Sequence, residues 1–313
     1  KFLKAMGPPP RALVGPEHIR AELEGKAWTR EADLEECAGM YEAAARALLA
    51  VKPSMLLAGC QLSDDEVRYL PGVLNACPAL LTLEIAKSGL AGERAVSVLQ
   101  GLEAGSLPQL SRLDLSENEL GDAASTALAE ALGGTAHLQA SCSPKRAPRC
   151  AVELMALEEL VLEECGLGPK GFETLLVALG EQQPRLVALN VSLNRFGDQG
   201  MKAFRRLKGD ALKGLEDLRL VGCEIGDAGA LILVEALFAG LLPAVAEVGS
   251  HQGCVDLSRN QCQQSDAALR AVLLERATKG EQRGVGRSGK SAVAEVSKLR
   301  LHVKAQKKGC SVA

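Results

Sequence analysis

The chain has 313 residues, of which 47% are hydrophobic and 24% are charged, and its formal net charge is −3. This is the composition of a soluble globular protein that can fill a core, and the small net charge gives no reason to expect nucleic-acid binding. Aromatic residues amount to 3%, so aliphatic side chains and alanine must supply the packing. The longest apolar run, 229–248, contains Glu235 and Pro243, which argues against a membrane span.

The first 50 residues differ in character from the rest. Residues 1–15 contain the stretch GPPP and are expected to form an arm or linker. Because the chain starts at Lys1 and not at a methionine, we expect it to begin inside a longer protein, and the apolar part of KFLKAMGPPP is too short for a signal peptide. Residues 16–50 read as helix, with Trp28 and Tyr41 as large apolar anchors, and predict a helical N-terminal cap over the first repeat.

A repeated template organises the chain from residue 51 to residue 277. In LSRLDLSENEL (110–120), leucines stand at positions one, four, six and eleven, and Asn118 stands at position nine. The template recurs at 52–62, 80–90, 157–167, 186–196, 215–225 and 252–262. In chain order, position nine is occupied by Cys60, Ser88, Asn118, Cys165, Asn194, Cys223 and Asn260.

The spacing of these copies indicates one structural unit per repeat. Four steps between successive ninth positions agree: 28 (60 to 88), 30 (88 to 118), 29 (165 to 194) and 29 (194 to 223). The other two are longer and place insertions near 138–154 and 240–251. A fixed period of this length predicts a solenoid, in which each unit buries its apolar face against its neighbours.

These repeats resemble the leucine-rich repeat family, specifically its long, ribonuclease-inhibitor-like class. The resemblance implies one short strand and one helix per repeat. We therefore expect an α/β solenoid shaped as a curved horseshoe, with parallel strands inside and helices outside. In this arrangement the run 229–248 is the helix of the sixth repeat.

The residue chemistry of the template agrees with this fold. Alternation in LDLS turns Leu113 and Leu115 to one side of a strand. The amide of Asn118 can donate to and accept from neighbouring loop backbones, and Cys or Ser can do part of this in less space. The cysteines at this position are thus interpreted as structural, reduced thiols of an intracellular protein, and not as metal ligands. At the start of each helix an acidic residue is expected to be an N-cap, at Asp122, Asp198, Asp227 and Asp266.

The segment GVGRSGKS (284–291) matches the phosphate-loop pattern G-x-x-x-x-G-K-[ST]. Such a loop needs an apolar strand before it, whereas the polar stretch RATKGEQR precedes Gly284. We therefore interpret 278–295 as a flexible linker and expect no nucleotide or other cofactor. VSKLRLHVK (296–304) fits the template and predicts a capping strand within 296–313, followed by a basic tail.

Neither metal-binding nor catalytic residues stand out. Two cysteines flank the basic stretch SCSPKRAPRC (141–150), but their spacing is too wide for a zinc knuckle. This stretch is expected to be a surface loop, with a partner-docking loop as the alternative. The four histidines are scattered without an acid or nucleophile at a fixed spacing, so no enzyme activity is predicted.

The inner face of the solenoid carries the prediction of function. The strand positions whose side chains point away from the core are acidic in repeats two to four and mixed to basic toward the C-terminus. Adjacent carboxylates repel one another, and a basic partner would neutralise them. The predicted partner-binding stripe consists of Glu84, Asp114, Glu117, Glu159, Glu163 and Glu164.

The predicted function is a non-catalytic protein-protein interaction scaffold or a structural subunit of a multi-protein assembly. Its expected partner is a protein, basic where it meets the stripe, and neither nucleic acid nor a membrane span is predicted. The alternative is a regulator of an enzyme, as are two proteins of this repeat class, the Ran GTPase-activating protein and ribonuclease inhibitor. A cytoplasmic place, including cytoskeletal or ciliary ones, is expected, and an organelle also fits.

Overall fold

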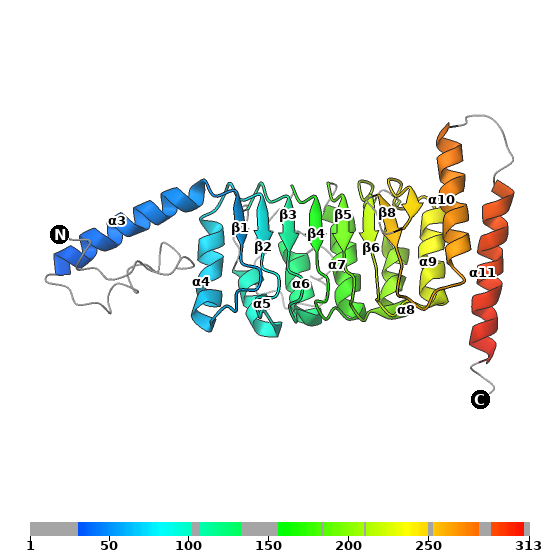
Figure 1. The fold of residues 1–313 in the computed structure, drawn as a ribbon, viewed down its shortest axis with the longest axis horizontal. Helices are drawn as coiled ribbons and strands as arrows, with labels where there is room; N and C mark the ends of the chain where they lie inside the picture. The colour runs from blue at the N-terminus through cyan, green and yellow to red at the C-terminus, as the bar shows by residue number, and fades with distance from the viewer. Residues whose placement is uncertain are drawn as a thin grey trace, which may run out of the picture.

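The structure is a computed structural model that describes residues 31–101, 107–132, 156–182, 185–209, 211–249, 253–281 and 289–309. Strands and helices alternate along most of this length, as the repeat template predicts (Figure 1). The strands are β1 (Ser54–Leu56), β2 (Thr82–Glu84), β3 (Arg112–Asp114), β4 (Glu159–Val161), β5 (Ala188–Asn190), β6 (Asp217–Arg219), β7 (Glu247–Val248) and β8 (Cys254–Asp256).

One helix follows almost every strand. Within the repeats, the helices are α4 (Asp64–Asn75), α5 (Gly92–Gln100), α6 (Gly121–Ala131), α7 (Pro169–Gln182), α8 (Gly197–Met201) with the 3-10 helix η3 (Lys202–Arg206), α9 (Asp227–Phe238) and α10 (Asp266–Glu281). The helix α3 (Glu31–Ala50) precedes the repeats, and α11 (Gly289–Gly309) follows them.

The strands form a single parallel sheet in the order β1-β2-β3-β4-β5-β6-β8-β7. Neighbouring strands pair in the register of the template, so that Leu83, Leu113, Leu160, Leu189 and Leu218 align in one row. Parallel strands lie about 4.8 Å apart, whereas packed helices need about 8–10 Å. A stack of such units therefore bends with its strands on the inner side. The predicted α/β solenoid of parallel strands and outer helices is confirmed.

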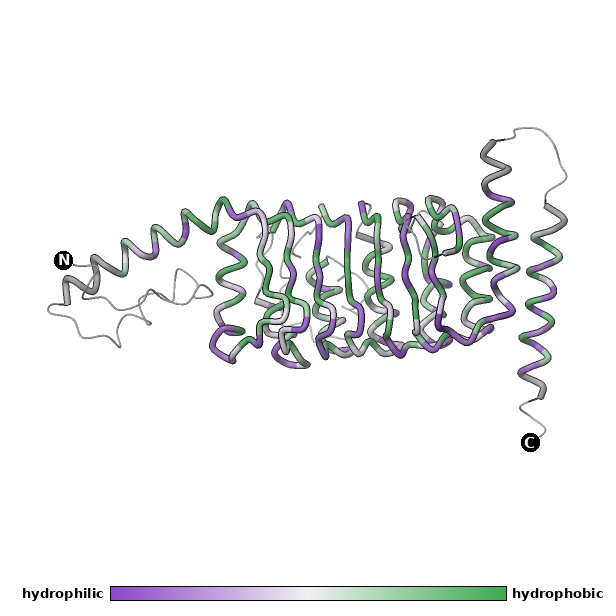
Figure 2. Tube along the Cα trace, viewed as in Figure 1, coloured by the Kyte–Doolittle hydropathy of each residue, from purple (hydrophilic) through white to green (hydrophobic). Residues whose placement is uncertain are grey.

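The core lies between the sheet and the helices. Leu113, Leu115, Leu160, Leu162, Leu189, Leu218 and Leu220 are all buried, as their template positions predict. Hydropathy alternates along the strands because each sends one side chain into the core and the next to the inner face (Figure 2). In repeats four and five, Phe172 and Phe196 stack with their ring centroids 4.0 Å apart. Packing is thus continuous from one repeat to the next.

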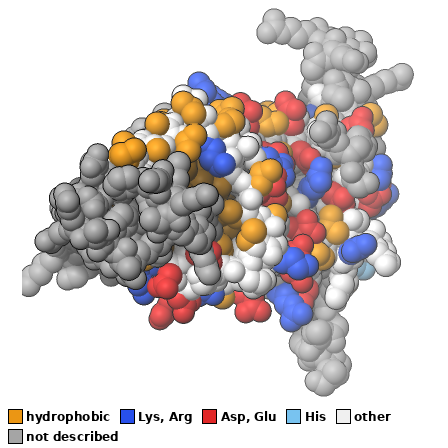
Figure 3. All heavy atoms as spheres, turned by 60° about the vertical axis from the view of Figure 1, so that its left-hand side comes forward, with side chains coloured by type: hydrophobic (Ala, Val, Ile, Leu, Met, Phe, Trp, Pro, Cys, Tyr) orange, Lys and Arg blue, Asp and Glu red, His pale blue; other side chains and the backbone are white. Residues whose placement is uncertain are grey.

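The helical cap expected over residues 16–50 stays a prediction, of which the structure describes the helix α3, with Leu49 packed against the core. α3 extends away from the sheet (Figure 1), and Leu56 of the edge strand β1 is 62% exposed. Hydrophobic side chains gather at this end of the molecule (Figure 3), including the exposed Leu48 and Val51. Residues 16–30 of the predicted cap lie outside the described residues.

The region of the second predicted insertion adds a strand to the sheet. β7 follows α9 in the chain but pairs in parallel with the outer edge of β8, with Val248 opposite Val255. Before β7, the buried Leu241 and Leu242 join the core. The first predicted insertion, near 138–154, lies outside the described residues.

The C-terminal segment is a helix and not the predicted capping strand. α11 covers residues 289–309 and packs against α9 and α10. Its buried side chains are Ala292, Val296, Leu299 and Val303, a spacing of four, three and four that suits a helix. The apolar residues in VSKLRLHVK fit both the strand template and this helical spacing, and the helix buries more of them together. The linker predicted for 278–295 is likewise helical at both ends, within α10 and α11.

The phosphate-loop match falls between these two helices. Residues 284–288 lie outside the described residues, while Gly289, Lys290 and Ser291 open α11. The element that leads into the segment is the helix α10, not a strand. A phosphate loop requires the opposite arrangement, with a strand before the loop. Across the described ranges, no helix is long and apolar enough to cross a membrane.

Candidate protein-binding face

The inner face is built from the strand positions that alternate with the buried leucines. Parallel pairing places residues from successive repeats side by side, for instance Arg112 beside Glu159 and Glu84 beside Asp114. From the first strand residue to the turn, repeats two to seven carry eight carboxylates and four basic groups on this face. The face is therefore acidic overall, although less so than the predicted stripe alone.

Arg112 lies at the centre of the predicted stripe and pairs with three of its members. Its guanidinium contacts Glu159, lies 3.3 Å from Asp114 Oδ2 and lies 3.5 Å from Glu84 Oε1. The hydrogen bond to Glu159 is the main cause that raises the pKa of Arg112 above its ordinary value, with the other two carboxylates adding to it. The premise that these acids repel one another without a partner is wrong for Glu84, Asp114 and Glu159, because Arg112 neutralises part of their charge.

The other three stripe residues lie where the strands turn. Glu117 pairs with Lys87 at 3.1 Å, and Glu163 Oε2 accepts a hydrogen bond of 2.9 Å from the side-chain amide of Asn190. Glu164 is exposed. Glu163 and Glu164 are thus neighbours on the face. The contact of Glu163 that the structure shows is with the amide of Asn190, which is not basic. These two acids form the part of the stripe best placed to meet an outside cation.

A second charged cluster lies on β6 and β8 and was not part of the predicted stripe. Arg219 lies 3.0 Å from Asp217 Oδ2, and the carboxylate of Asp256 on β8 adds to its electrostatic environment. The hydrogen bond that Arg219 donates to Asp217 is the main cause that raises the pKa of Arg219. The sequence signal for this cluster was present, because Asp217 and Asp256 occupy inner template positions like those of Glu159 and Asp114.

The ninth template position supports this face from behind. The side-chain amide of Asn194 donates to the carbonyl oxygens of Leu162 and Val191, at 2.7 and 2.9 Å. Its oxygen accepts from the backbone N–H groups of Cys165 and Leu167 of the preceding repeat, at 3.0 and 2.9 Å. Asn118 and Asn260 make equivalent bonds. Each asparagine thereby joins its repeat to the one before it.

Cysteine and serine alternate with these asparagines and donate to carbonyls of the preceding repeat. Cys165 Sγ donates to Leu115 O at 3.2 Å, Cys223 Sγ to Val191 O at 3.3 Å, and Ser88 Oγ to Leu57 O at 2.7 Å. Burial raises the pKa of both thiols to about 12, so they stay protonated. Cys60 differs from this pattern because β1 is the edge strand. No earlier strand covers Cys60, and it is exposed.

The acidic residues predicted as N-caps act between repeats instead of on their own helices. Asp122 Oδ1 accepts from the backbone N–H groups of Gly168 and Gly171, at 2.9 and 3.0 Å, where α7 begins. Asp198 Oδ1 does the same for Gly226 and Gly229 at the start of α9, at 2.8 Å each. The carboxylate can approach this closely because glycine has no Cβ.

The prediction that each aspartate caps its own helix is therefore wrong for Asp122 and Asp198. Neither α6 nor α8 has a side-chain cap hydrogen bond. The second residue of the helix is too far into the first turn to reach its own free N–H groups, and the next helix lies within reach. Asp227 follows the same rule and accepts from Gln264 N at 3.1 Å, ahead of α10.

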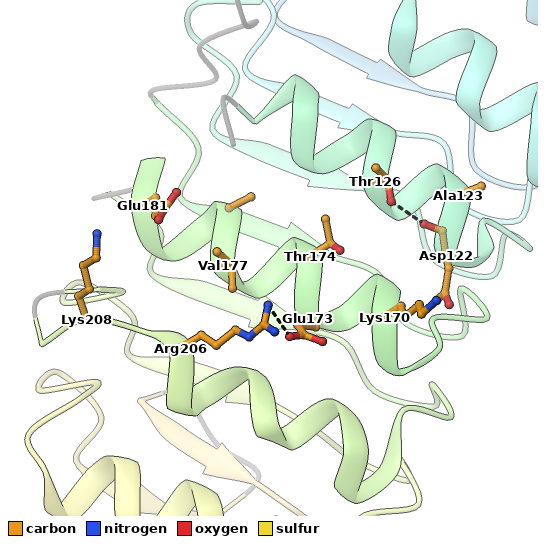
Figure 4. A pocket seen from close by; sticks show the side chains of 11 residues that line it. Asp122, Ala123, Thr126, Lys170, Glu173, Thr174, Val177, Glu181, Arg206 and Lys208 are labelled. Carbon is orange, nitrogen blue, oxygen red and sulfur yellow. Dashed lines mark hydrogen bonds and ion pairs between the residues drawn. The ribbon is translucent and has the colours of Figure 1, made fainter. Parts of the chain in front are cut away.

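The outer face holds a cavity of about 800 Å³ between α6, α7 and η3 (Figure 4). Three of its charged groups are already engaged, since Asp122 caps α7 and Glu173 pairs with Arg206 at 2.8 Å. Within the described residues, no group of three or more His, Cys, Asp or Glu side chains could hold a metal ion. The acidic inner face thus remains the candidate site with the clearest chemistry.

Comparison with known proteins supports the fold. A family model described as "Leucine Rich repeat" matches residues 184–204 and 215–233, which contain β5, α8 and β6. The chain is 30% identical to Ribonuclease inhibitor of Sus scrofa over 196 residues, 54% of this chain and 39% of that protein. It is also 30% identical to Tonsoku-like protein of Bos taurus over 203 residues, 64% of this chain and 13% of that protein.

The fold is a leucine-rich-repeat solenoid, and the chain is similar to proteins of the ribonuclease-inhibitor-like class. The seven template copies, the eight-stranded parallel sheet and the asparagine bonds between repeats all agree with these matches. The chain spans less than half the length of the two relatives named.

Proposed function

We propose that this protein is a non-catalytic binding scaffold that holds a basic protein segment on its acidic inner face, as a subunit of a larger intracellular assembly. The observation that carries the proposal is the excess of eight carboxylates over four basic groups on one continuous parallel sheet. Extended concave surfaces of this kind are the usual binding surfaces of solenoids.

The geometry narrows the contact to a part of that face. Arg112 and Arg219 each hold neighbouring carboxylates in fixed positions, and Glu163 and Glu164 lie between these two clusters along the sheet. A lysine or arginine of the partner would pair with Glu163 and Glu164 without displacing a basic side chain. Charges at such a site chiefly speed association and select partners of opposite sign.

A double charge reversal tests this proposal. In the variant Glu163→Lys with Glu164→Lys, retention of the partner should fall roughly tenfold, because two attractive contacts become repulsive. The matched control is Asp65→Lys with Glu93→Lys, two exposed acids on the outer helices α4 and α5. The tagged chain serves as bait, and quantitative mass spectrometry compares the co-purified proteins.

The proposal predicts that proteins lost from the Glu163/Glu164 variant are retained by the control and by the unaltered chain. Their retention by the unaltered chain should also decline as salt rises, since screening acts on exposed charges. Equal loss with both variants would show that only net charge matters. Equal retention would show that the partner binds elsewhere, and either result would overturn the proposal.

The similarity to Ribonuclease inhibitor favours a second candidate, a regulator of an enzyme. The same class of solenoid could also act on a small GTPase, as the Ran GTPase-activating protein does. Adding the chain to a ribonuclease assay and to a GTP hydrolysis assay separates the candidates. A scaffold should leave both rates unchanged, whereas a regulator should change one of them in proportion to its concentration.

A further inference from the structure

The C-terminal helix α11 covers a helix face that differs from its equivalents elsewhere in the solenoid. On α9, Asp227, Leu231 and Glu235 follow one another at intervals of four and so form one stripe. Leu231 is only 9% exposed. At the equivalent position, eight residues after the ninth template position, the other repeats carry Arg68, Val96, Thr126, Glu173, Lys202 and Ala268. The outer face of α9 is therefore apolar where most of the outer helices are polar.

The polar residues at the two ends of this stripe contact α11. Arg300 Nε lies 2.8 Å from Glu235 Oε1, and His302 Nε2 lies 3.3 Å from Asp227 Oδ2. Gln306 also donates to Asp227 Oδ2, at 3.4 Å. α11 also buries the narrow seam Ala292, Val296, Leu299 and Val303, which contains no aromatic side chain. α11 thus fits the stripe as a basic, amphipathic helix.

If α11 were removed, both acidic residues of α9, Asp227 and Glu235, would still have a partner. Glu235 would keep its contact with Arg205 of η3, at 3.5 Å, and Asp227 would keep the backbone N–H of Gln264, at 3.1 Å. The main loss would be the cover over Leu231. A docked helix can be exchanged for another when it buries a narrow apolar seam and when the acidic residues that it contacts, here Asp227 and Glu235, keep other partners after it leaves.

From this geometry we propose that the outer face of α9 and α10 is a second binding surface, for an amphipathic helix of a partner protein, and that α11 occupies it in cis as a displaceable strap. The partner helix presents small apolar residues at intervals of four and three, and a cation that meets Glu235. This surface lies on the opposite side of the molecule from the strands, so the inference does not depend on the proposed function.

The test uses the full chain and a labelled peptide with the sequence of residues 289–309. In Arg300→Glu the contact with Glu235 becomes repulsive, and the open state gains population. Amide exchange within 296–303 should accelerate about threefold to tenfold. The peptide should bind this variant more tightly by the same factor, because it competes with α11 for one surface. The control Lys298→Glu makes the same charge change at a side chain that pairs with Glu295 on α11 itself, and it should alter neither quantity.

Two results would overturn the proposal. Unchanged exchange in Arg300→Glu would show that α11 does not open as a strap. Faster exchange without tighter peptide binding would show that the uncovered face does not accept a helix. Exchange in α5, far from α11, reports whether the fold of the variant is intact.

Discussion

At the scale of single residues, the ninth template position decides how well the repeats adhere to one another. Asn194 is fully buried and satisfies two backbone N–H groups and two or more carbonyls that no other group in its loop reaches. Cys165 and Cys223 supply one weaker donor each and accept nothing in the same geometry. Alternation of the two types gives every turn between repeats an amide acceptor on one side.

Replacing Asn194 by alanine should therefore be costly. The change removes the acceptor of the N–H groups of Cys165 and Leu167 and the amide donor to Leu162 O, and the free energy of unfolding should fall by roughly 3 kcal/mol or more. The control is Asn190→Ala on the half-buried inner face, where the cost should stay below about 1 kcal/mol. Urea unfolding of both variants measures the difference. Similar costs would contradict the role given to Asn194.

The thiols at this position should be chemically silent in the folded protein. Burial raises the pKa of Cys165 and Cys223 to about 12, so at pH 8 almost no thiolate, the reactive form, is present. Cys60 is exposed and should react. Alkylation at pH 8 followed by peptide mass spectrometry should modify Cys60 first, and both buried thiols only after unfolding. Early modification of Cys165 would show that its turn opens in the native state.

At the scale of elements, the repeats are joined through the starts of their helices as well as through the sheet. Asp198 accepts two backbone N–H groups of the next helix, α9, and Asp122 does the same for α7. An N-cap within one helix stabilises that helix alone, whereas this carboxylate links two units. The Gly-x-x-Gly pattern at 168–171 and 226–229 is the sequence counterpart, because a Cβ at Gly171 or Gly229 would lie 2.5 Å from the carboxylate.

Asp198→Ala should accordingly destabilise α9 and not its own helix. Loss of this cap should cost about 1 kcal/mol and increase amide exchange in the first turn of α9. Asp266→Ala is the control, because Asp266 opens the helix of the last repeat and pairs with Arg270 on its own helix. Hydrogen exchange resolved by peptide is the measurement. Faster exchange confined to α8 would contradict capping between repeats.

At the scale of the whole molecule, the periodic part of the structure could be predicted from the sequence, and the C-terminal helix could not. Leucines at fixed spacing imply one buried row per repeat, and a repeat of 28 to 30 residues leaves room for one strand and one helix. The terminal segments lack that redundancy. Val296 and Leu299 suit both the strand template, together with Leu301, and a helix face, together with Val303. Only the packing of this segment against α9 and α10 decides between the two.

The sequence was enough to predict which residues lie on the candidate face, but not which of them form ion pairs with one another. Template positions identified which side chains share the inner face. Whether Arg112 would point toward Glu159 or away from it depends on rotamers that the spacing does not determine. The capping partners of Asp122 and Asp198 were missed for the same kind of reason, since contacts between repeats follow from how the helices stack.

The central claim is that the basic protein partner of the proposed function binds the strand side of the solenoid, and not the outer face of α6 and α7. Photo-crosslinking at single positions tests it most directly, with a photoreactive residue at Ala188 on β5 or at Val177 on α7. Both side chains are half-buried and lie in neighbouring repeats. The account predicts that the partner crosslinks through position 188, that the adduct weakens as salt rises, and that position 177 gives none. A partner that crosslinks through position 177 while position 188 stays free would contradict it.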